Sequence, residues 1–299
     1  DRAVRVHEHL LSRGDLSRTD RERAQHELAQ DFFKAGLFDR AESAYEALKG
    51  SAFDQDAAQA LLSLYERSRE WRKAAEVAES LEASGTGSFA TRVANYWCEL
   101  ALEAQSQQQH EEARRWLEQA RQRAPQSARA HVLLGQMQAR SGDHAGAMAT
   151  YAELLKTRPE AFNLAARDYA QSALAISAQS QALAVLEAQY RRHPSMALLQ
   201  AIALLEPAPQ SLRQRLAEHL RVEPAALSAA TQLLQQSQSS QQPLNEDEAQ
   251  LVGQALQRTL RPLQRYRCAA CGFESQHYFW QCPGCLSWDS YPPRHVEEL

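Results

Sequence analysis

The sequence predicts an all-α fold: a superhelix of stacked helix hairpins, followed by a small metal-binding knuckle near the C-terminal end. Composition gives the first indication, because the 299 residues include only 11 glycines and 11 prolines and are rich in alanine, leucine, glutamine, glutamate and arginine, which favour helices. A regularly spaced alanine gives the second. Four cysteines in two C-x-x-C pairs give the third.

The recurring alanine marks an internal repeat over the first two thirds of the chain. Successive alanines of the series are 38, 33, 39, 34 and 35 residues apart, close to the period of about 34 residues of tetratricopeptide (TPR) repeats. A small alanine lets two helices approach closely, and one hairpin cannot bury its apolar face without a neighbour. We therefore predict a TPR array over residues 1–195. The alanines, each with the residue four positions later, are Ala3/His7, Ala41/Tyr45, Ala74/Ala78, Ala113/Leu117, Ala147/Tyr151 and Ala182/Leu186.

Further sequence signals mark the turns within the hairpins and the N-terminal start of the array. Gly36 and Gly142 lie in short turns between paired helices, where glycine can adopt the left-handed conformation. Residues 1 to about 13 resemble the second helix of a truncated first repeat, and we expect the face they leave open to pair with a second copy in a homodimer.

The period fades after Pro194, and residues 196–264 are predicted to form a C-terminal helical extension of the array. Pro224 suits the first turn of its helix, and Asn245 with Glu248 resembles a helix N-cap and its reciprocal partner. The expected segments are helices at 196–205, 211–221, 224–236 and 245–260, with a polar linker at 237–243.

The knuckle is predicted to form a separate domain over residues 265–299. Cys268 and Cys271 form one C-x-x-C pair, and Cys282 and Cys285 form a second pair ten residues further on. Two such turns supply the four sulfurs that a tetrahedral Zn²⁺ or Fe ion prefers. So short a segment has too small a core to offset its loss of conformational entropy without a metal. Four sulfur ligands also leave no open coordination position for hydrolytic catalysis.

Other details of the knuckle refine this prediction. Gly272 and Gly284 fit tight turns that require a positive φ. Two disulfides between the four cysteines are the alternative to a metal site, and would suit an extracellular chain. His277 lies between the pairs but is not needed as a ligand, because four sulfurs already complete the set. Seven of the chain's 22 aromatic residues lie in this segment, more than it can enclose, so we predict that the knuckle packs against the helical array. The seven are Tyr266, Phe273, Tyr278, Phe279, Trp280, Trp288 and Tyr291.

Charge and hydropathy narrow the classes of partner. A net charge of −4 gives no reason to expect binding to nucleic acid, and no phosphate-binding loop motif occurs in the sequence. The longest apolar run, Met196 to Leu205, is ten residues long, which is too short to span a bilayer. We therefore expect no membrane-spanning segment within this chain. Its start at Asp1 without methionine, in the middle of a helical pattern, indicates a missing N-terminal portion that could include an anchor.

The order of parts resembles one known family. A TPR array followed by Tyr266-Arg267-Cys268-x-x-Cys271-Gly272-Phe273, and then by Trp280-x-Cys282-Pro283-x-Cys285-x-x-Trp288, is similar to the lipopolysaccharide assembly protein B family, whose C-terminal knuckle is rubredoxin-like. Residues 1–7, 14–18 and 35–42 are similar to that family as well. The resemblance covers nearly the whole chain.

This resemblance implies a non-enzymatic adaptor at the cytoplasmic face of the inner membrane of a Gram-negative bacterium, where an N-terminal helix absent from this chain holds the full-length protein. In that family the adaptor works with the membrane-bound AAA protease FtsH to promote degradation of the LpxC deacetylase, and so regulates lipopolysaccharide biosynthesis. Other lipopolysaccharide assembly proteins are further expected partners.

The repeat register also indicates a binding groove. In stacked hairpins the first helices line a concave groove that usually binds a peptide, and its three arginines could pair with the carboxylates of a partner. A solvated helix face is the alternative for any one of these residues. The residues placed on this face are Asn95, Arg129, Gln136, Arg140, Arg167 and Gln171.

A second function from another class is a rubredoxin-like iron electron-transfer protein fused to a TPR scaffold, because Cys₄ iron sites can carry one electron. Metal analysis and colour would separate the two. Cys98, the remaining cysteine, is expected to pack in the core rather than act as a nucleophile.

Overall fold

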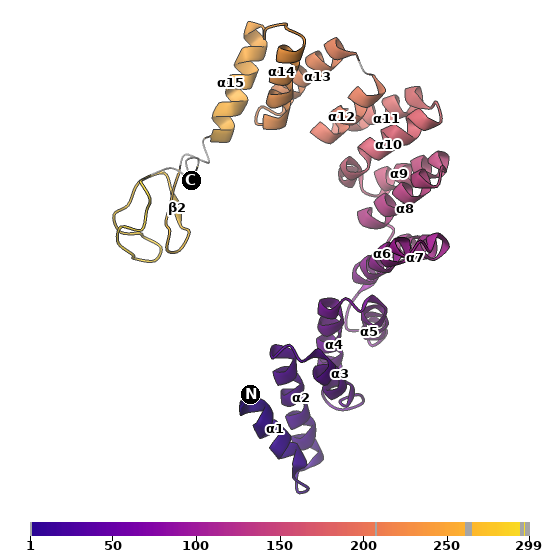
Figure 1. Cartoon of the computed structure of the whole chain (residues 1–299), viewed down its shortest axis with the longest axis vertical. Coiled ribbons are helices and arrows are strands. Elements are labelled where there is room, and N and C mark those ends of the chain that lie inside the picture. The colour runs from indigo at the N-terminus through magenta and orange to yellow at the C-terminus, as the bar shows by residue number, and fades with distance from the viewer. Residues whose placement is uncertain (1, 207, 261–264, 294–295, 297–299) are drawn as a thin grey trace. The chain divides into compact units, whose positions relative to one another are not determined.

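Figure 1 shows the computed structural model, which describes residues 2–206, 208–260, 265–293 and 296. These residues form fifteen α-helices, one 3₁₀ helix and two short strands, so the predicted all-α array with a C-terminal knuckle is confirmed. The chain divides into two units, Asp1–Phe162 and Asn163–Leu299. The domain limits drawn from the sequence at residues 195 and 264 stay predictions. None of the described helices combines the length and hydropathy needed to cross a bilayer.

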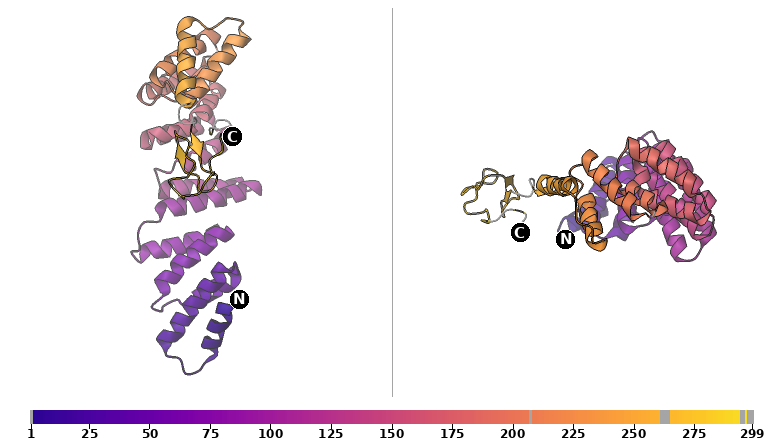
Figure 2. Two further views of the ribbon diagram at one scale, coloured as in Figure 1. Left: turned by 90° about the vertical axis from the view of Figure 1, so that its left-hand side faces the viewer. Right: turned by 90° about the horizontal axis from the view of Figure 1, so that it is seen from above.

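The first unit is built from helix hairpins stacked one on the next (Figure 2, indigo to magenta). The hairpins are α2–α3, α4–α5, α6–α7 and α8–α9, and α1 packs on α2. We call α2, α4, α6 and α8 the first helices, and α3, α5, α7 and α9 the second helices. Their bounds are α1 Arg2–Ser12, α2 Arg18–Lys34, α3 Phe38–Glu46, α4 Asp54–Ser68, α5 Trp71–Ala83, α6 Ala90–Ser106, α7 His110–Arg123, α8 Ala128–Arg140 and α9 His144–Thr157.

The recurring alanines lie where the helices of a hairpin meet. Ala41, Ala74, Ala113 and Ala147 are each 0% exposed, which leaves no room for a larger side chain and explains the constancy of the residue type. The side chains four positions later in these helices are buried as well. The first member of the series is an exception, because Ala3 is exposed and Val4 is the buried residue of α1.

The turn inside each hairpin contains a residue with positive φ, five positions before the alanine. Glycine occupies this position in only two hairpins, as the sequence predicted, and the others place a side chain in a conformation that strains L-residues. The position is therefore set by the repeat geometry, not by glycine itself. The residues and φ values are Gly36 (74°), Arg69 (60°), Gln108 (61°), Gly142 (87°) and, in the second unit, Ser177 (58°).

Ion pairs connect neighbouring repeats in the first unit. Ion pairs join each helix of the series α1, α3, α5, α7 and α9 to the next, with two pairs between α5 and α7, and two more pairs join first helices. Each pair is at least partly exposed and contributes little stability alone. The pairs along the series of α1 and the second helices are Glu8–Arg40, Glu42–Lys73, Arg72–Glu112, Glu82–Arg123 and Arg121–Glu153, and those between first helices are Glu66–Arg92 and Glu99–Arg129.

The second unit begins with one further hairpin, α10–α11, against which α12 packs. Helices α13, α14 and α15 then pack together around Leu216, Leu220 and Leu233. The knuckle follows with two antiparallel strands, β1 and β2. The bounds are η1 Pro159–Leu164, which straddles the limit between the units, α10 Ala166–Ala175, α11 Gln179–Arg192, α12 Met196–Leu205, α13 Pro209–Val222, α14 Leu227–Ser239, α15 Glu246–Leu260, β1 Tyr266–Arg267 and β2 Glu274–Ser275.

Helix starts in this unit match the prediction in part. Asn245 and Glu248 form the expected reciprocal cap: the Glu248 N–H donates to Asn245 Oδ1 at 2.8 Å, and the Asn245 N–H donates to Glu248 Oε2 at 2.9 Å. The prediction for Pro224 was wrong, because α14 begins only at Leu227.

Pro224 instead takes the second position of a turn closed by the Ala226 N–H donating to the Glu223 carbonyl. The fixed φ of proline suits that position. Two limits also shift: α13 begins at Pro209 rather than at residue 211, and α14 extends to Ser239, which shortens the expected linker.

The hairpin turns offer a direct test of backbone strain. A Cβ added at Gly142 would meet no atom within 4 Å, so Gly142→Ala changes only the cost of the positive φ. We expect this variant to lower the free energy of unfolding by about 1 kcal/mol. The converse change, Gln108→Gly, should raise the free energy of unfolding by up to about 1 kcal/mol, because glycine adopts the positive φ of this exposed position without the strain that glutamine bears. Chemical denaturation measures both, and equal signs for the two variants would contradict this account.

Candidate functional site

The knuckle is made of two turns with the same hydrogen-bonding pattern. In each C-x-x-C turn, the N–H of the first cysteine donates to the carbonyl five residues later, and the carbonyl of that cysteine accepts from the N–H four residues later. This pattern brings both sulfurs of a pair to one side of the turn. The bonds are Cys268 N to Phe273 O (2.9 Å), Gly272 N to Cys268 O (2.9 Å), Cys282 N to Ser287 O (2.9 Å) and Leu286 N to Cys282 O (2.8 Å).

Each turn ends in the left-handed conformation. Gly272 has a φ of 77°, as predicted, and the equivalent position of the second turn is Leu286, with a φ of 60°. The prediction of a positive φ for Gly284 was therefore wrong. Gly284 is needed for close approach instead, because a Cβ there would lie 3.3 Å from the Phe273 side chain.

The four sulfurs converge on one point. All lie within 4.8 Å of one another, the one such cluster among the described residues, and all four cysteines are free. The Cys268–Cys285 and Cys271–Cys282 sulfur distances are 3.8 and 3.7 Å. A tetrahedral ion with metal–sulfur bonds of about 2.3 Å requires separations of about 3.8 Å. The residues present therefore fit a Cys-coordinated ion, zinc or iron, and do not form the alternative disulfides.

The surroundings of the cysteines differ. Cys268 and Cys282 are buried, whereas Cys271 is exposed. Hydrogen bonding to Ser290 lowers the pKa of Cys268 to about 6, which favours the thiolate form that a metal requires. In contrast, burial raises the pKa of Cys98 to about 11, in keeping with the packing role expected for that residue. His277 is exposed.

The aromatic residues of the knuckle differ in exposure: Tyr291 is buried, Tyr266, Tyr278 and Phe279 are partly buried, and Phe273, Trp280 and Trp288 are exposed. Tyr291 is 2% exposed and forms the buried core of the knuckle with Cys268 and Cys282. Trp280 and Trp288 are each 68% exposed, so the aromatic surplus predicted from the sequence lies on the surface of the knuckle. Packing of this surface against the helical array stays a prediction.

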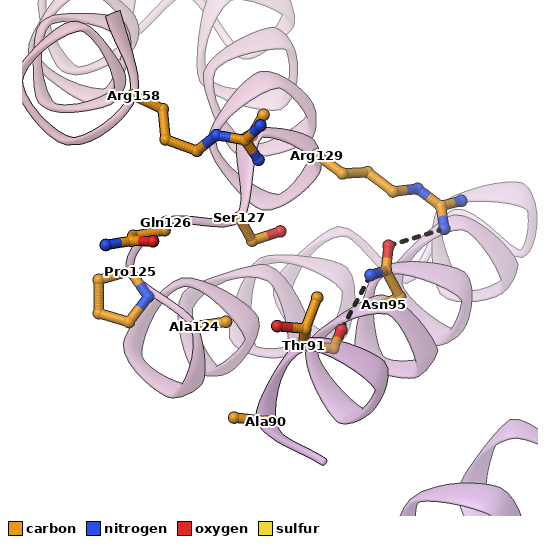
Figure 3. A pocket seen from close by; sticks show the side chains of 10 residues that line it. Ala90, Thr91, Asn95, Ala124, Pro125, Gln126, Ser127, Arg129 and Arg158 are labelled. Atoms are coloured by element: carbon orange, nitrogen blue, oxygen red, sulfur yellow. Dashed lines mark hydrogen bonds between the residues drawn. The ribbon is translucent and has the colours of Figure 1, made fainter. Parts of the chain in front are cut away.

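A pocket of about 540 Å³ lies in the first unit, between the start of α6 and the turn from α7 to α8 (Figure 3). Of the six residues placed on the groove face, Asn95 and Arg129 line this pocket. Gln136 and Arg140 lie further along α8, where Arg140 Nε donates to the Gln136 carbonyl. Arg167 and Gln171 are exposed residues of α10, in the other unit. The pocket thus brings together two of the six predicted residues.

The lining of this pocket combines four apolar with six polar residues and contains no carboxylate: Ala90, Thr91, Asn95, Ala124, Pro125, Gln126, Ser127, Ala128, Arg129 and Arg158. Arg129 is held on one side, because its Nη2 donates to Glu99 Oε1 at 2.6 Å and its Nη1 reaches Asn95 Oδ1 at 3.5 Å. Arg158 Nε donates to Glu160 Oε1 at 3.1 Å. The pocket therefore presents two guanidinium groups and several neutral hydrogen-bonding groups.

Arg158 and the turn residues Gln126 and Ser127 were missed by sequence reasoning, which considered helix positions only. The signal that could have found them is the repeat itself. Pro125 and Pro159 are 34 residues apart, and the residues just before them, Ala124 and Arg158, are the equivalent C-caps of α7 and α9.

Comparisons with known proteins agree with this architecture. Residues 98–162 match the tetratricopeptide repeat family, and residues 266–292 match a rubredoxin metal-binding domain. Lipopolysaccharide assembly protein B of Escherichia coli (strain K12) is 26% identical over 315 residues, which cover 98% of this chain and 76% of that protein.

The protein of that name from Haemophilus influenzae is 25% identical over 302 residues, covering 100% of this chain and 76% of its own length. The resemblance recognised from the sequence is thus confirmed along nearly the whole chain. Among solved structures, that of MamA superimposes with a TM-score of 0.36 at 18% identity, covering 57% of this chain and 90% of that one.

Removal of the metal provides a test of the knuckle. Cys282→Ser, or a strong chelator, should abolish protection of residues 265–293 in hydrogen exchange, because the buried core of this segment consists largely of the cysteines themselves. The helices of the first unit should keep their protection. Cys98→Ala, which removes a cysteine far from the cluster in sequence, should leave the metal content unchanged. A knuckle that stays protected without its metal would contradict this expectation.

Proposed function

We propose, from the likeness to lipopolysaccharide assembly protein B along nearly the whole chain, that this protein is a non-enzymatic adaptor that regulates lipopolysaccharide biosynthesis. The order of parts carries the proposal: stacked TPR hairpins followed by a four-cysteine knuckle. TPR hairpins are protein-binding scaffolds, and four sulfurs would complete the coordination of a tetrahedral ion. Both features suit a scaffold in which the metal is structural.

In this proposal the adaptor acts at the cytoplasmic face of the inner membrane, where the full-length protein is held by an N-terminal helix. It brings the LpxC deacetylase to the membrane-bound protease FtsH and so promotes degradation of LpxC. Other lipopolysaccharide assembly proteins would bind the same scaffold.

We assign the pocket at Asn95, Arg129 and Arg158 to binding of an acidic segment of a partner. The lining contains two arginines and no Asp or Glu, which favours binding of a carboxylate from the partner, because guanidinium groups bind carboxylates in bidentate geometry. Glu99 already accepts one hydrogen bond from Arg129. A partner carboxylate would therefore compete with Glu99, or share Arg129 with it.

The competition leads to variants with opposite effects. Arg129→Ala should weaken binding of the partner by about 10-fold or more, the amount expected for loss of a hydrogen bond to a charged group. Glu99→Gln should strengthen binding, because it releases Arg129. Arg129→Glu should weaken binding further, because it places a second carboxylate where the carboxylate of the partner would bind. Calorimetry with purified LpxC and with the cytoplasmic domain of FtsH measures each affinity.

Arg114→Ala is the matched control, since Arg114 pairs with Glu118 in its own helix and does not line the pocket. Thermal melting establishes that each variant is folded. Unchanged affinity of folded Arg129→Ala and Arg158→Ala would remove the pocket from the proposal.

The adaptor role itself is tested in cells. Full-length protein should co-purify with FtsH, and its loss should lengthen the half-life of LpxC. Cys282→Ser should have the same effect as loss of the protein, because the knuckle would lose its metal. An LpxC half-life that does not depend on this protein would overturn the proposal.

A further inference from the structure

Three side-chain hydroxyl groups lie against three of the four cysteine sulfurs. Ser290 Oγ is 3.2 Å from Cys268 Sγ, Ser287 Oγ is 3.3 Å from Cys285 Sγ, and the Tyr291 hydroxyl is 3.7 Å from Cys282 Sγ. All three hydroxyl groups come from the five residues 287–291, directly after the second C-x-x-C pair. The fourth sulfur belongs to Cys271, the exposed cysteine.

The tyrosine is held in place for this contact. Its side chain is 2% exposed, and a buried hydroxyl group is costly without a hydrogen-bond partner. Tyr278 donates from its hydroxyl group to the Tyr291 carbonyl at 3.1 Å, which fixes the backbone there. The Cys282 sulfur is the polar atom that the Tyr291 hydroxyl reaches.

The position of the hydrogen on Ser290 depends on the state of the sulfur. Ser290 Oγ donates to the Ser287 carbonyl at 3.2 Å, which leaves its lone pairs for the S–H of a protonated Cys268. A metal-bound thiolate carries no hydrogen and accepts only. A hydroxyl hydrogen rotates freely between acceptors, so Ser290 can turn its hydrogen from the carbonyl to the sulfur when a metal is held.

We propose that Ser287, Ser290 and Tyr291 are positioning residues of the metal site, whose hydroxyl groups donate hydrogen bonds to metal-bound thiolates and retain the ion. The proposal rests on the cysteine cluster and not on the adaptor function. Its physical basis is that a donor draws negative charge from sulfur, which makes the thiolate less basic and less reactive toward acid or electrophiles. Groups that hold metal ligands in this way commonly change metal affinity by about 10- to 100-fold.

The zinc form of the whole chain provides the first test. Ser290→Ala, Ser287→Ala and Tyr291→Phe should each release zinc to a chromogenic chelator about 10-fold faster, and Ser290→Thr should restore the original rate. Ser275→Ala is the matched control, because Ser275 lies in the same knuckle and its Oγ accepts from the His277 N–H rather than meeting a sulfur.

The iron-substituted form gives a readout that a purely structural role would not move. Loss of a donor leaves more negative charge on sulfur, which stabilises the ferric state, so the reduction potential should become more negative in each of the three variants. Ser275→Ala and Ser290→Thr should keep the potential of the unchanged protein.

The expected result is faster zinc release together with a more negative potential in the serine variants, whether or not Tyr291→Phe remains folded. Release rates and potentials that are unchanged in both serine variants would overturn the proposal. Equal changes in the Ser275→Ala control would overturn it as well, because they would assign the effect to general loosening of the knuckle. Neither result bears on whether the protein binds FtsH or LpxC, so the two proposals can fail separately.

Discussion

The structure depends on one packing constraint: a helix hairpin has an apolar face that only a neighbouring hairpin can cover. The constraint is met by a fully buried alanine in each second helix from Ala41 to Ala147, where the backbones come close enough for nothing larger. It is also met at a local cost. Arg69 and Gln108 adopt a left-handed conformation that glycine would adopt without strain. This local strain is tolerated because the turn sets the direction in which the second helix packs back on the first.

Stacking places equivalent helices of successive repeats side by side, so oppositely charged side chains on these helices can pair. Glu99–Arg129, which joins the first helices α6 and α8, is one such ion pair between repeats. This pair also borders the pocket beside Asn95. An arginine that already has an acidic neighbour can exchange one carboxylate for another at modest cost, since partly exposed pairs are weak. In the function we propose, this contact between repeats is also part of the recognition site.

The knuckle is subject to a different constraint: it is too small to form a hydrophobic core of its own. Over residues 265–293 its buried residues are Cys268, Cys282 and Tyr291, so the centre of the fold and the centre of the metal site are the same group of atoms. Hydroxyl groups of the segment that closes the knuckle reach the sulfurs. Folding of this segment and retention of the ion are therefore one process, which suits a structural metal.

The sequence by itself determined the architecture. The alanine period predicted the hairpins, the C-x-x-C spacing predicted the sulfur cluster, and Asn245 with Glu248 predicted the start of α15, because each is a short-range pattern whose geometry is fixed along the chain. The positive φ of Leu286, the close approach of Phe273 to Gly284, and the true role of Pro224 could not be predicted, because they depend on how a turn closes against its neighbours.

Only the tertiary structure decided which side chains meet. It placed Asn95 and Arg129 in one pocket, added Arg158 from the end of another repeat, and brought Ser287, Ser290 and Tyr291 to the sulfurs. A period locates residues along a helix, but contacts between helices and loops follow from packing in three dimensions, which leaves no regular spacing in the sequence.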